Sequence, residues 1–181
     1  MKSRSLLRII LRAHGYALLV VGTFLVGLPW LAHTLVGPLL GAELPAALAP
    51  VGYVMLPLAT SLSGICFWLF MTKGRGTAFP TDPPRALLIL GPYRYVRNPM
   101  YVGNLSIVFA EALAFRSVGV LLYAILLSLV THVYVTRSEE PALEARYGQA
   151  YRRYRETVPR WMPSVRRLLR ARGRPHATPI T

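Results

Sequence analysis

The segment VGVLLYAILLSLVTHVYVT, residues 118–136, decides the fold because it is a long apolar run without a formal charge. A helix of about 20 such residues crosses the roughly 30 Å apolar core of a bilayer. Three further apolar runs lie at residues 15–36, 46–71 and 99–115, and the last of them is interrupted by Glu111. The runs are continuous rather than alternating, which indicates helices and not barrel strands. The sequence therefore predicts an all-α integral membrane protein with about four transmembrane helices.

The composition supports this assignment and narrows the class of partner. Apolar residues make up 54% of the 181 residues and charged residues 15%, whereas a soluble domain carries about 25% charged residues. The net charge of +14 suits nucleic acid or an anionic membrane, and the apolar excess favours membrane lipids and no nucleic acid. A lone cysteine and four scattered histidines predict no disulfide framework and no metal site. We expect that cysteine, Cys66, to be a packing residue.

The distribution of basic residues predicts an orientation. Of the 21 lysines and arginines, all except Arg116 fall before the first run, between the second and third, or after the fourth. Basic residues flanking spans collect on the cytoplasmic side. We therefore expect both termini in the cytoplasm, in a bacterial inner membrane.

The loop before the third run carries the most unusual stretch of the chain. Asn98-Pro99 predicts a helix start, because Asn is a favoured N-cap and Pro is favoured at the first helical position. The free N–H groups of such a start attract anions, and Arg94 and Arg97 lie just before it. Two interpretations stay open: an anion site, or ordinary positive flanking with interfacial tyrosines.

Two acidic residues are predicted to meet this helix start. The short turn at Arg116-Ser117 makes the last two runs an antiparallel hairpin, so Glu139 and Glu140 return to the level of Asn98. Packed helices lie about 8–10 Å apart, which brings cationic and anionic groups together at the membrane surface. This arrangement suits a zwitterionic amino-acid group. The alternative is a solvated acidic pair neutralised by neighbouring arginines.

Beyond these residues the sequence predicts an amphipathic helix at the membrane surface. Pro141 can start it, and apolar or tyrosine side chains recur at helical spacing at Leu143, Tyr147, Tyr151, Tyr154 and Val158. His132 can share a helix face with Glu139, as a catalyst or as a packed polar residue. We assign no role to Glu111.

Four motifs in order resemble those of the isoprenylcysteine carboxyl methyltransferase family, which shares its C-terminal half with phospholipid N-methyltransferases. They are GPYRYVRNPMYVG at 91–103, Glu139-Glu140-x-x-Leu143, Tyr147-Gly-x-x-Tyr151-x-x-Tyr154 and Val158-Pro-Arg-Trp-x-Pro163. The resemblance covers about residues 74–163. The first two runs match only as generic membrane helices.

The resemblance implies a membrane methyltransferase that uses S-adenosylmethionine without a Rossmann fold. The cofactor would lie at the cytoplasmic ends of the last two spans, beneath the C-terminal segment. Asn98 stands where the family usually has His, so it cannot act as a base or a cation. The candidate cofactor-binding residues are Gly91, Tyr93, Arg97, Asn98, Pro99, Tyr101, Glu139, Glu140 and Tyr151.

The acceptor is expected to be a lipophilic small molecule or a lipid-modified group, with carboxyl methylation of an isoprenylcysteine-like substrate favoured. A carboxylate needs no general base, and Arg160 can hold it by a bidentate contact. A thiol or amine would need deprotonation, with Glu140 or His132 as candidates. Arg160, Glu140 and His132 are therefore the candidate catalytic residues.

Three alternatives remain: methylation of a phospholipid or small thiol, an NADPH-dependent membrane reductase of the sterol-reductase type, and a non-catalytic scaffold. The expected organisation has three parts. Residues 1–72 form an N-terminal pair of spans, residues 73–163 form the catalytic region with the other two spans, and residues 164–181 form a basic, disordered tail. The sequence does not predict the oligomeric state.

Overall fold

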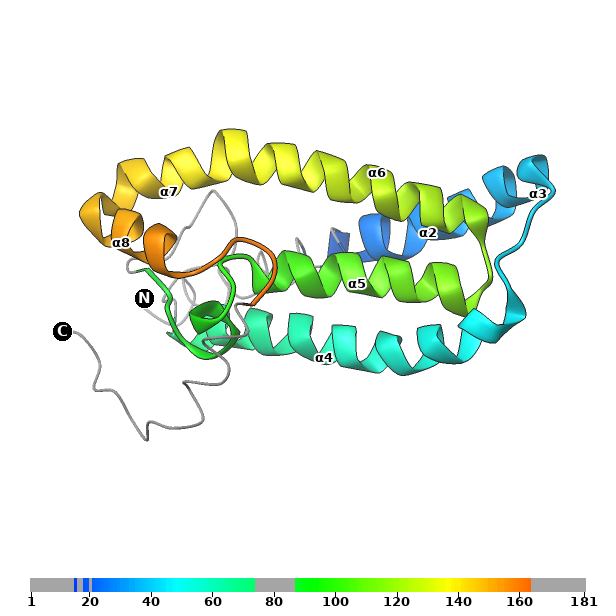
Figure 1. Ribbon diagram of the computed structural model, residues 1–181, viewed down its shortest axis with the longest axis horizontal. Coiled ribbons are helices and arrows are strands. Elements are labelled where there is room, and N and C mark those ends of the chain that lie inside the picture. The colour runs from blue at the N-terminus through cyan, green and yellow to red at the C-terminus, as the bar shows by residue number, and fades with distance from the viewer. Residues whose placement is uncertain (1–14, 16–17, 20, 74–86, 164–181) are drawn as a thin grey trace, which may run out of the picture.

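The computed structural model describes residue 15 and residues 18–19, 21–73 and 87–163. The basic N-terminal segment, the loop at 74–86 and the tail at 164–181 lie outside the described residues. Helices form nearly all of the described chain, which contains no strand (Figure 1). In order they are η1 (Val21–Gly27), α2 (Leu28–Leu31), η2 (Ala32–Val36), α3 (Gly37–Leu40), η3 (Ala46–Leu48), α4 (Ala49–Lys73), η4 (Gly91–Arg94), α5 (Pro99–Ala114), α6 (Val118–Tyr134), η5 (Val135–Glu139), α7 (Glu140–Tyr147) and α8 (Gln149–Thr157).

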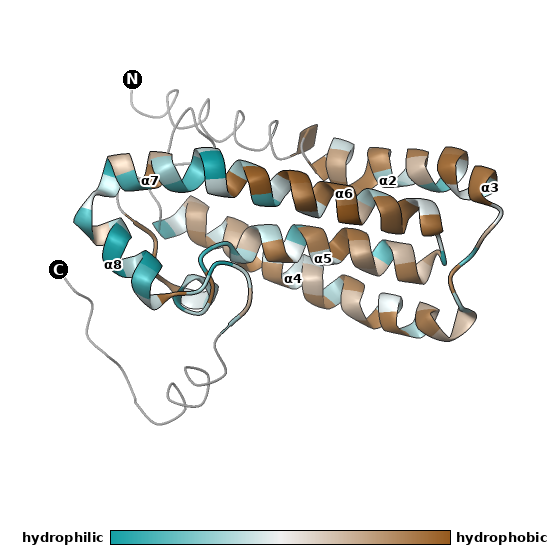
Figure 2. Cartoon of the chain, turned by 45° about the horizontal axis from the view of Figure 1, so that its top comes forward, coloured by the Kyte–Doolittle hydropathy of each residue, from teal (hydrophilic) through white to brown (hydrophobic). Residues whose placement is uncertain are grey.

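The prediction of an all-helical membrane protein is confirmed. Three helices are long and apolar enough to cross a membrane, at Val21–Leu40, Ala46–Lys73 and Val118–Tyr147. The fourth apolar helix, α5, has 16 residues, about 24 Å at 1.5 Å per residue. These helices lie side by side, with apolar residues along their length and polar residues gathered at the α7–α8 end (Figure 2).

The first helix extends further than predicted. Its described part runs continuously to Leu40 rather than ending at Val36, and it alternates between α-helical and wider π-helical turns. Pro29 and Pro38 lie within it. Proline lacks the N–H that an α-helical turn needs, and neighbouring turns adjust around the missing bond.

Helices α4 and α5 make the closest contact in the bundle, and two glycines allow it. A Cβ at Gly52 would collide with the backbone of Ala110 and Ala114, and one at Gly103 would collide with Ser63. Small residues let membrane helices approach closely. The Ser63 hydroxyl also donates a hydrogen bond to Asn104 Oδ1 across this contact, at 2.9 Å.

The turn between α5 and α6 is clamped to the loop that precedes α4. Arg116 has a φ of +55°, which permits the abrupt reversal. Its Nη2 lies 2.8 Å from the Glu43 carboxylate, and its Nε donates to the Leu44 carbonyl at 3.0 Å. The Ser117 hydroxyl caps α6 by accepting a hydrogen bond from Val120 N. The predicted antiparallel hairpin of the last two apolar runs is therefore present.

Burial is uneven across the bundle, as expected for helices that face lipid. Cys66 is fully buried and packs with Leu88 and Tyr93, as predicted. The outward-facing side chains are large and apolar: Trp30 is 67% exposed, Trp68 60% and Leu126 60%. Exposed apolar surface of this kind is stable only in a nonpolar solvent.

The predicted single amphipathic helix after Pro141 is wrong in its boundaries. Helix α7 begins at Glu140 with Pro141 in its first turn, as predicted, but it follows α6 and η5 without a break, so the fourth helix continues to Tyr147. Gly148 then adopts a φ of +54° and ends α7, and α8 begins at Gln149. The chain therefore turns back at Gly148, and α8 returns toward the start of α5 (Figure 1).

Candidate functional site

The site is built where α5 begins. Helix α5 starts at Pro99, as predicted, but the Asn98 side chain does not cap it. Asn98 is buried, and its Nδ2 donates to the carbonyl of Arg160 at 3.4 Å. The predicted side-chain cap is absent for a geometric reason. The C-terminal segment passes beside the helix start, and the Asn98 amide donates to that segment instead.

A single turn of 3₁₀-helix, η4, holds the chain before this helix start. Gly91 begins this turn with a φ of +54°. Tyr93 lies within the turn and is buried against Cys66 and Leu88. The Tyr93 carbonyl accepts a hydrogen bond from the Tyr154 hydroxyl at 2.6 Å. Burial raises the pKa of both Tyr93 and Tyr154, so both stay neutral. Gly91 and Tyr93 thus shape the loop and anchor α8 to it.

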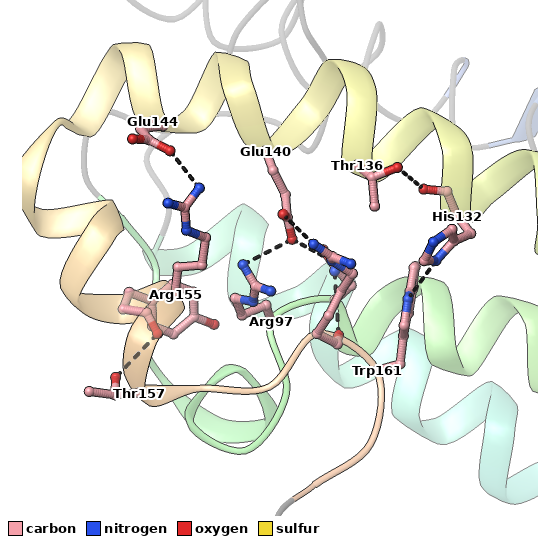
Figure 3. A network of polar contacts seen from close by, with 11 residues as sticks. Arg97, His132, Thr136, Glu140, Glu144, Arg155, Thr157 and Trp161 are labelled. Atoms are coloured by element: carbon pink, nitrogen blue, oxygen red, sulfur yellow. Dashed lines mark hydrogen bonds and ion pairs between the residues drawn. The ribbon is translucent and has the colours of Figure 1, made fainter.

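Glu140 is the centre of a buried ion cluster (Figure 3). Only 7% of its side chain is exposed, and its Oε1 lies 2.9 Å from Arg97 Nη1. Arg160 forks onto the same carboxylate, with Nε donating to Oε1 at 2.8 Å and Nη2 to Oε2 at 2.9 Å. These hydrogen bonds raise the pKa of Arg160. One buried carboxylate therefore faces two guanidinium groups.

Arg97 has hydrogen-bonding capacity to spare. Its side chain is 8% exposed. Neither its Nε nor its Nη1 makes an aligned hydrogen bond with any described residue, although Nη1 forms the ion pair with Glu140. A buried guanidinium left partly unpaired costs free energy, which a bound anion would recover.

Glu139 has a different environment from its neighbour. It is partly buried, and its Oε2 accepts a hydrogen bond from the Tyr101 hydroxyl at 2.8 Å. No arginine is paired with it among the described residues. Glu139 therefore has no cationic partner among the described residues, whereas two arginines neutralise the charge of Glu140.

Helix α8 closes one wall of the site with its tyrosines. Tyr151 is 2% exposed and Tyr154 is 5% exposed. Their rings meet edge to face, with the ring centroids 6.2 Å apart. Burial and the nearby Glu140 raise the pKa of Tyr151, against the opposing effect of the Arg97 guanidinium. The predicted tyrosine stripe thus faces inward, toward the ion cluster.

The segment after α8, residues 158–163, crosses the site, and we call it the strap. Arg97 N donates to the Pro159 carbonyl at 2.8 Å. Trp161 Nε1 donates to His132 Nδ1 at 3.1 Å, which fastens the strap to α6. His132 has no contact with either glutamate in this arrangement. The sequence placed Trp161 in the Val158-Pro-Arg-Trp-x-Pro163 motif but indicated no role for it.

The structure thus brings together most of the residues that the sequence singled out: Arg97, Asn98, Pro99, Tyr101, Glu139, Glu140, Tyr151 and Arg160. Arg94 is exposed and lies outside the cluster. Among the described residues, no group of three or more His, Cys, Asp or Glu side chains is placed to hold a metal ion. The site offers guanidinium, carboxylate and phenol groups.

Comparison with known proteins identifies the family of the chain. A model of the phospholipid methyltransferase family (PEMT) matches residues 51–150, which is more than half of the chain. The chain belongs to the phospholipid methyltransferase family. No curated protein matches it significantly. The match spans α4 to the start of α8 and includes both glutamates and the helix start at Pro99. With its apolar spans, this member of the family is an integral membrane methyltransferase.

Proposed function

We propose that the protein transfers a methyl group from S-adenosylmethionine to a lipophilic acceptor, within the ion cluster at the start of α5. The observation that carries the proposal is Arg97, a buried guanidinium whose Nε makes no aligned hydrogen bond with any described residue, together with Glu139, a nearby carboxylate that no described arginine pairs with. The donor set fits the amino-acid end of that cofactor, which carries one carboxylate and one ammonium group.

Each residue has a distinct part in this proposal. Arg97 binds the carboxylate through its guanidinium, whose Nε has no aligned partner among the described residues, and Glu139 binds the ammonium group, with Tyr101 fixing its orientation. Glu140 and Arg160 hold Arg97 and the strap in place. When bound, the cofactor would supply a methyl group carried on a sulfonium, ready for displacement by the acceptor. Positioning supplies most of the catalysis for such a displacement.

Two acceptors are supported by different observations. The motif resemblance favours an isoprenylcysteine-like carboxylate held by Arg160, although Arg160 here forks onto Glu140. The family match favours the amine of a phospholipid head group. An amine must lose its proton before attack, and Glu140 is poorly placed to accept that proton because two arginines neutralise its carboxylate.

Binding of the cofactor is tested by titration calorimetry on the protein purified in detergent. Wild type should bind S-adenosylmethionine, and Arg97→Gln and Glu139→Gln should each weaken binding by about tenfold or more, because a charge-assisted contact is worth about 1.5–3 kcal/mol. Arg94→Gln is the matched control, an exposed arginine of the same loop, and should bind as wild type does. Saturation by NADPH instead would favour the reductase.

The acceptor is tested by transfer of labelled methyl groups. Two acceptors are tested in separate reactions with equal amounts of protein and cofactor. One reaction contains phosphatidylethanolamine vesicles, and the other contains a prenylated cysteine. Label in the phospholipid with none in the prenylcysteine would select the amine, and the reverse would select the carboxylate. A protein that binds neither S-adenosylmethionine nor NADPH and keeps its cellular effect with Arg97 and Glu139 neutralised would be a scaffold.

The environment of the site completes the proposal. The protein is placed in a bacterial inner membrane with both termini in the cytoplasm. This orientation is supported by the basic residues, which fall almost entirely on one side of the spans. The cofactor would then enter from the cytoplasm and the acceptor from the bilayer. Labelling of engineered cysteines near each terminus in intact cells and in inverted vesicles tests this topology.

A further inference from the structure

Four contacts hold the strap in place, and one of them lies outside the ion cluster. Its backbone is held by Arg97 N on Pro159 O and by Asn98 Nδ2 on the Arg160 carbonyl. The Arg160 side chain reaches Glu140. The remaining contact is between Trp161 and His132, with the two rings 6.1 Å apart.

The geometry gives this last contact a particular effect on Arg160. His132 precedes Glu140 by eight residues on one continuous helix, which is about 12 Å along its axis. Arg160 and Trp161 are neighbours, and their side chains reach these two points of the same helix (Figure 3). The strap is therefore fixed along the helix at two points, and cannot shift without breaking at least one of them.

We propose that His132 and Trp161 are positioning residues, which form a latch that holds the strap closed and sets Arg160 on Glu140. The contact itself is independent of the proposed function. Its effect on cofactor exchange rests on that function, because the strap crosses the groups assigned to the cofactor and must open for the cofactor to leave. His132 then acts by accepting a hydrogen bond and does no proton transfer.

Hydrogen exchange of the Arg97 amide measures the latch directly, because that amide donates to Pro159 of the strap. In ligand-free protein in detergent, His132→Leu and Trp161→Phe should each speed exchange of this amide about three- to tenfold, the effect of losing one hydrogen bond. The double variant should exchange no faster than either single variant. The Val102 amide, which donates to the Asn98 carbonyl within α5, is the internal control and should not change.

Two variants separate the latch from a general aromatic or interfacial effect. His132→Asn places an acceptor where Nδ1 was, and should return exchange to within about twofold of wild type. Trp68→Phe alters another outward-facing tryptophan and should change nothing. An unchanged rate in His132→Leu, or effects of the two single variants that multiply in the double, would overturn the proposal.

The functional arm follows release of the probe S-adenosylhomocysteine. The latch variants should release it about three- to tenfold faster, with His132→Asn near wild type. Bound probe with an unchanged release rate would overturn the gating role even if exchange changed. A wild-type protein that binds no probe would refute the proposed function, while the exchange result would still decide whether the latch exists.

Discussion

The two ends of the bundle each hold an arginine–glutamate pair, but in opposite surroundings. At the turn end, Arg116 is 41% exposed and its partner Glu43 is 70% exposed. At the site end, Arg97 is 8% exposed and Glu140 is 7% exposed. Exposed pairs contribute little to stability, whereas buried charges are costly to desolvate and costly to leave unpaired. The comparison indicates that the turn end is a fastening, while the site end keeps charges buried for a purpose other than stability.

The largest expected effect comes from removing the charge at the centre of the buried cluster. Glu140→Gln leaves Arg97 and Arg160 without a counterion, and should lower the free energy of unfolding by about 3 kcal/mol. Titration with sodium dodecyl sulfate, followed by helical circular dichroism, measures it. Glu144→Gln is the control, since Glu144 also accepts from two arginines but both are about half exposed; it should cost less than about 1 kcal/mol. Equal losses would remove the distinction between buried and exposed clusters.

Packing provides a second comparison along the same axis. Gly52→Ala meets the backbone of Ala110 and Ala114 toward the turn end, and should cost about 2 kcal/mol of unfolding free energy. Gly103→Ala meets the Ser63 hydroxyl most closely and then backbone atoms of Ser63 and Ala59 at 3.0 and 3.2 Å. The hydroxyl can rotate at the expense of its hydrogen bond to Asn104, and the backbone approach is less severe than at Gly52, so the cost should be smaller.

Gly64→Ala is the control for both packing variants, because nothing lies within 4 Å of the added Cβ, and it should cost nothing measurable. The same detergent titration measures all three. Cofactor affinity of folded Gly52→Ala should match wild type, because the substitution lies away from the site. A loss of affinity there would show that the two ends are coupled through α5.

Two tyrosine hydroxyls allow the site and the rest of the bundle to be compared through the loss of a single hydrogen bond in each. Tyr101→Phe removes the hydrogen bond to Glu139, and Tyr123→Phe removes one to the Phe24 carbonyl. Each should cost about 1 kcal/mol of unfolding free energy. Only Tyr101→Phe should weaken cofactor binding, by about fivefold in calorimetry, since only Glu139 is assigned to the ligand. Weakening by both variants would contradict that assignment.

Much of this site was predictable because it depends on local signals and on helix length. Asn98-Pro99 identified the helix start, and counting residues around the turn at Arg116 brought Glu139 and Glu140 back to it. The tyrosine spacing identified the buried face of α8. These features follow from the rise of a helix and from capping preferences, both of which a single sequence contains.

The remaining features depend on where the chain turns after the last apolar helix. Gly148 ends α7 with a positive φ, and the return path brings residues 158–163 onto the helix start. The Asn98 amide then bonds to the strap, and Arg160 forks onto Glu140. The Trp161–His132 contact joins residues 29 apart. None of these contacts follows from sequence spacing, because a one-residue change in the turn would redirect the whole strap.

The smallest expected effect lies at the turn end. Glu43→Gln removes the exposed ion pair but leaves Arg116 Nε on the Leu44 carbonyl and Leu44 N on the Arg116 carbonyl. The backbone fastening therefore survives, and the loss of unfolding free energy should be below about 1 kcal/mol, shrinking further in high salt because exposed charges are screened. Detergent titration of both proteins at low and high salt measures the difference. A loss as large as that of Glu140→Gln, or one that does not change with salt, would mean that the surrounding detergent shields this pair from water and that its contribution is larger than its exposure implies.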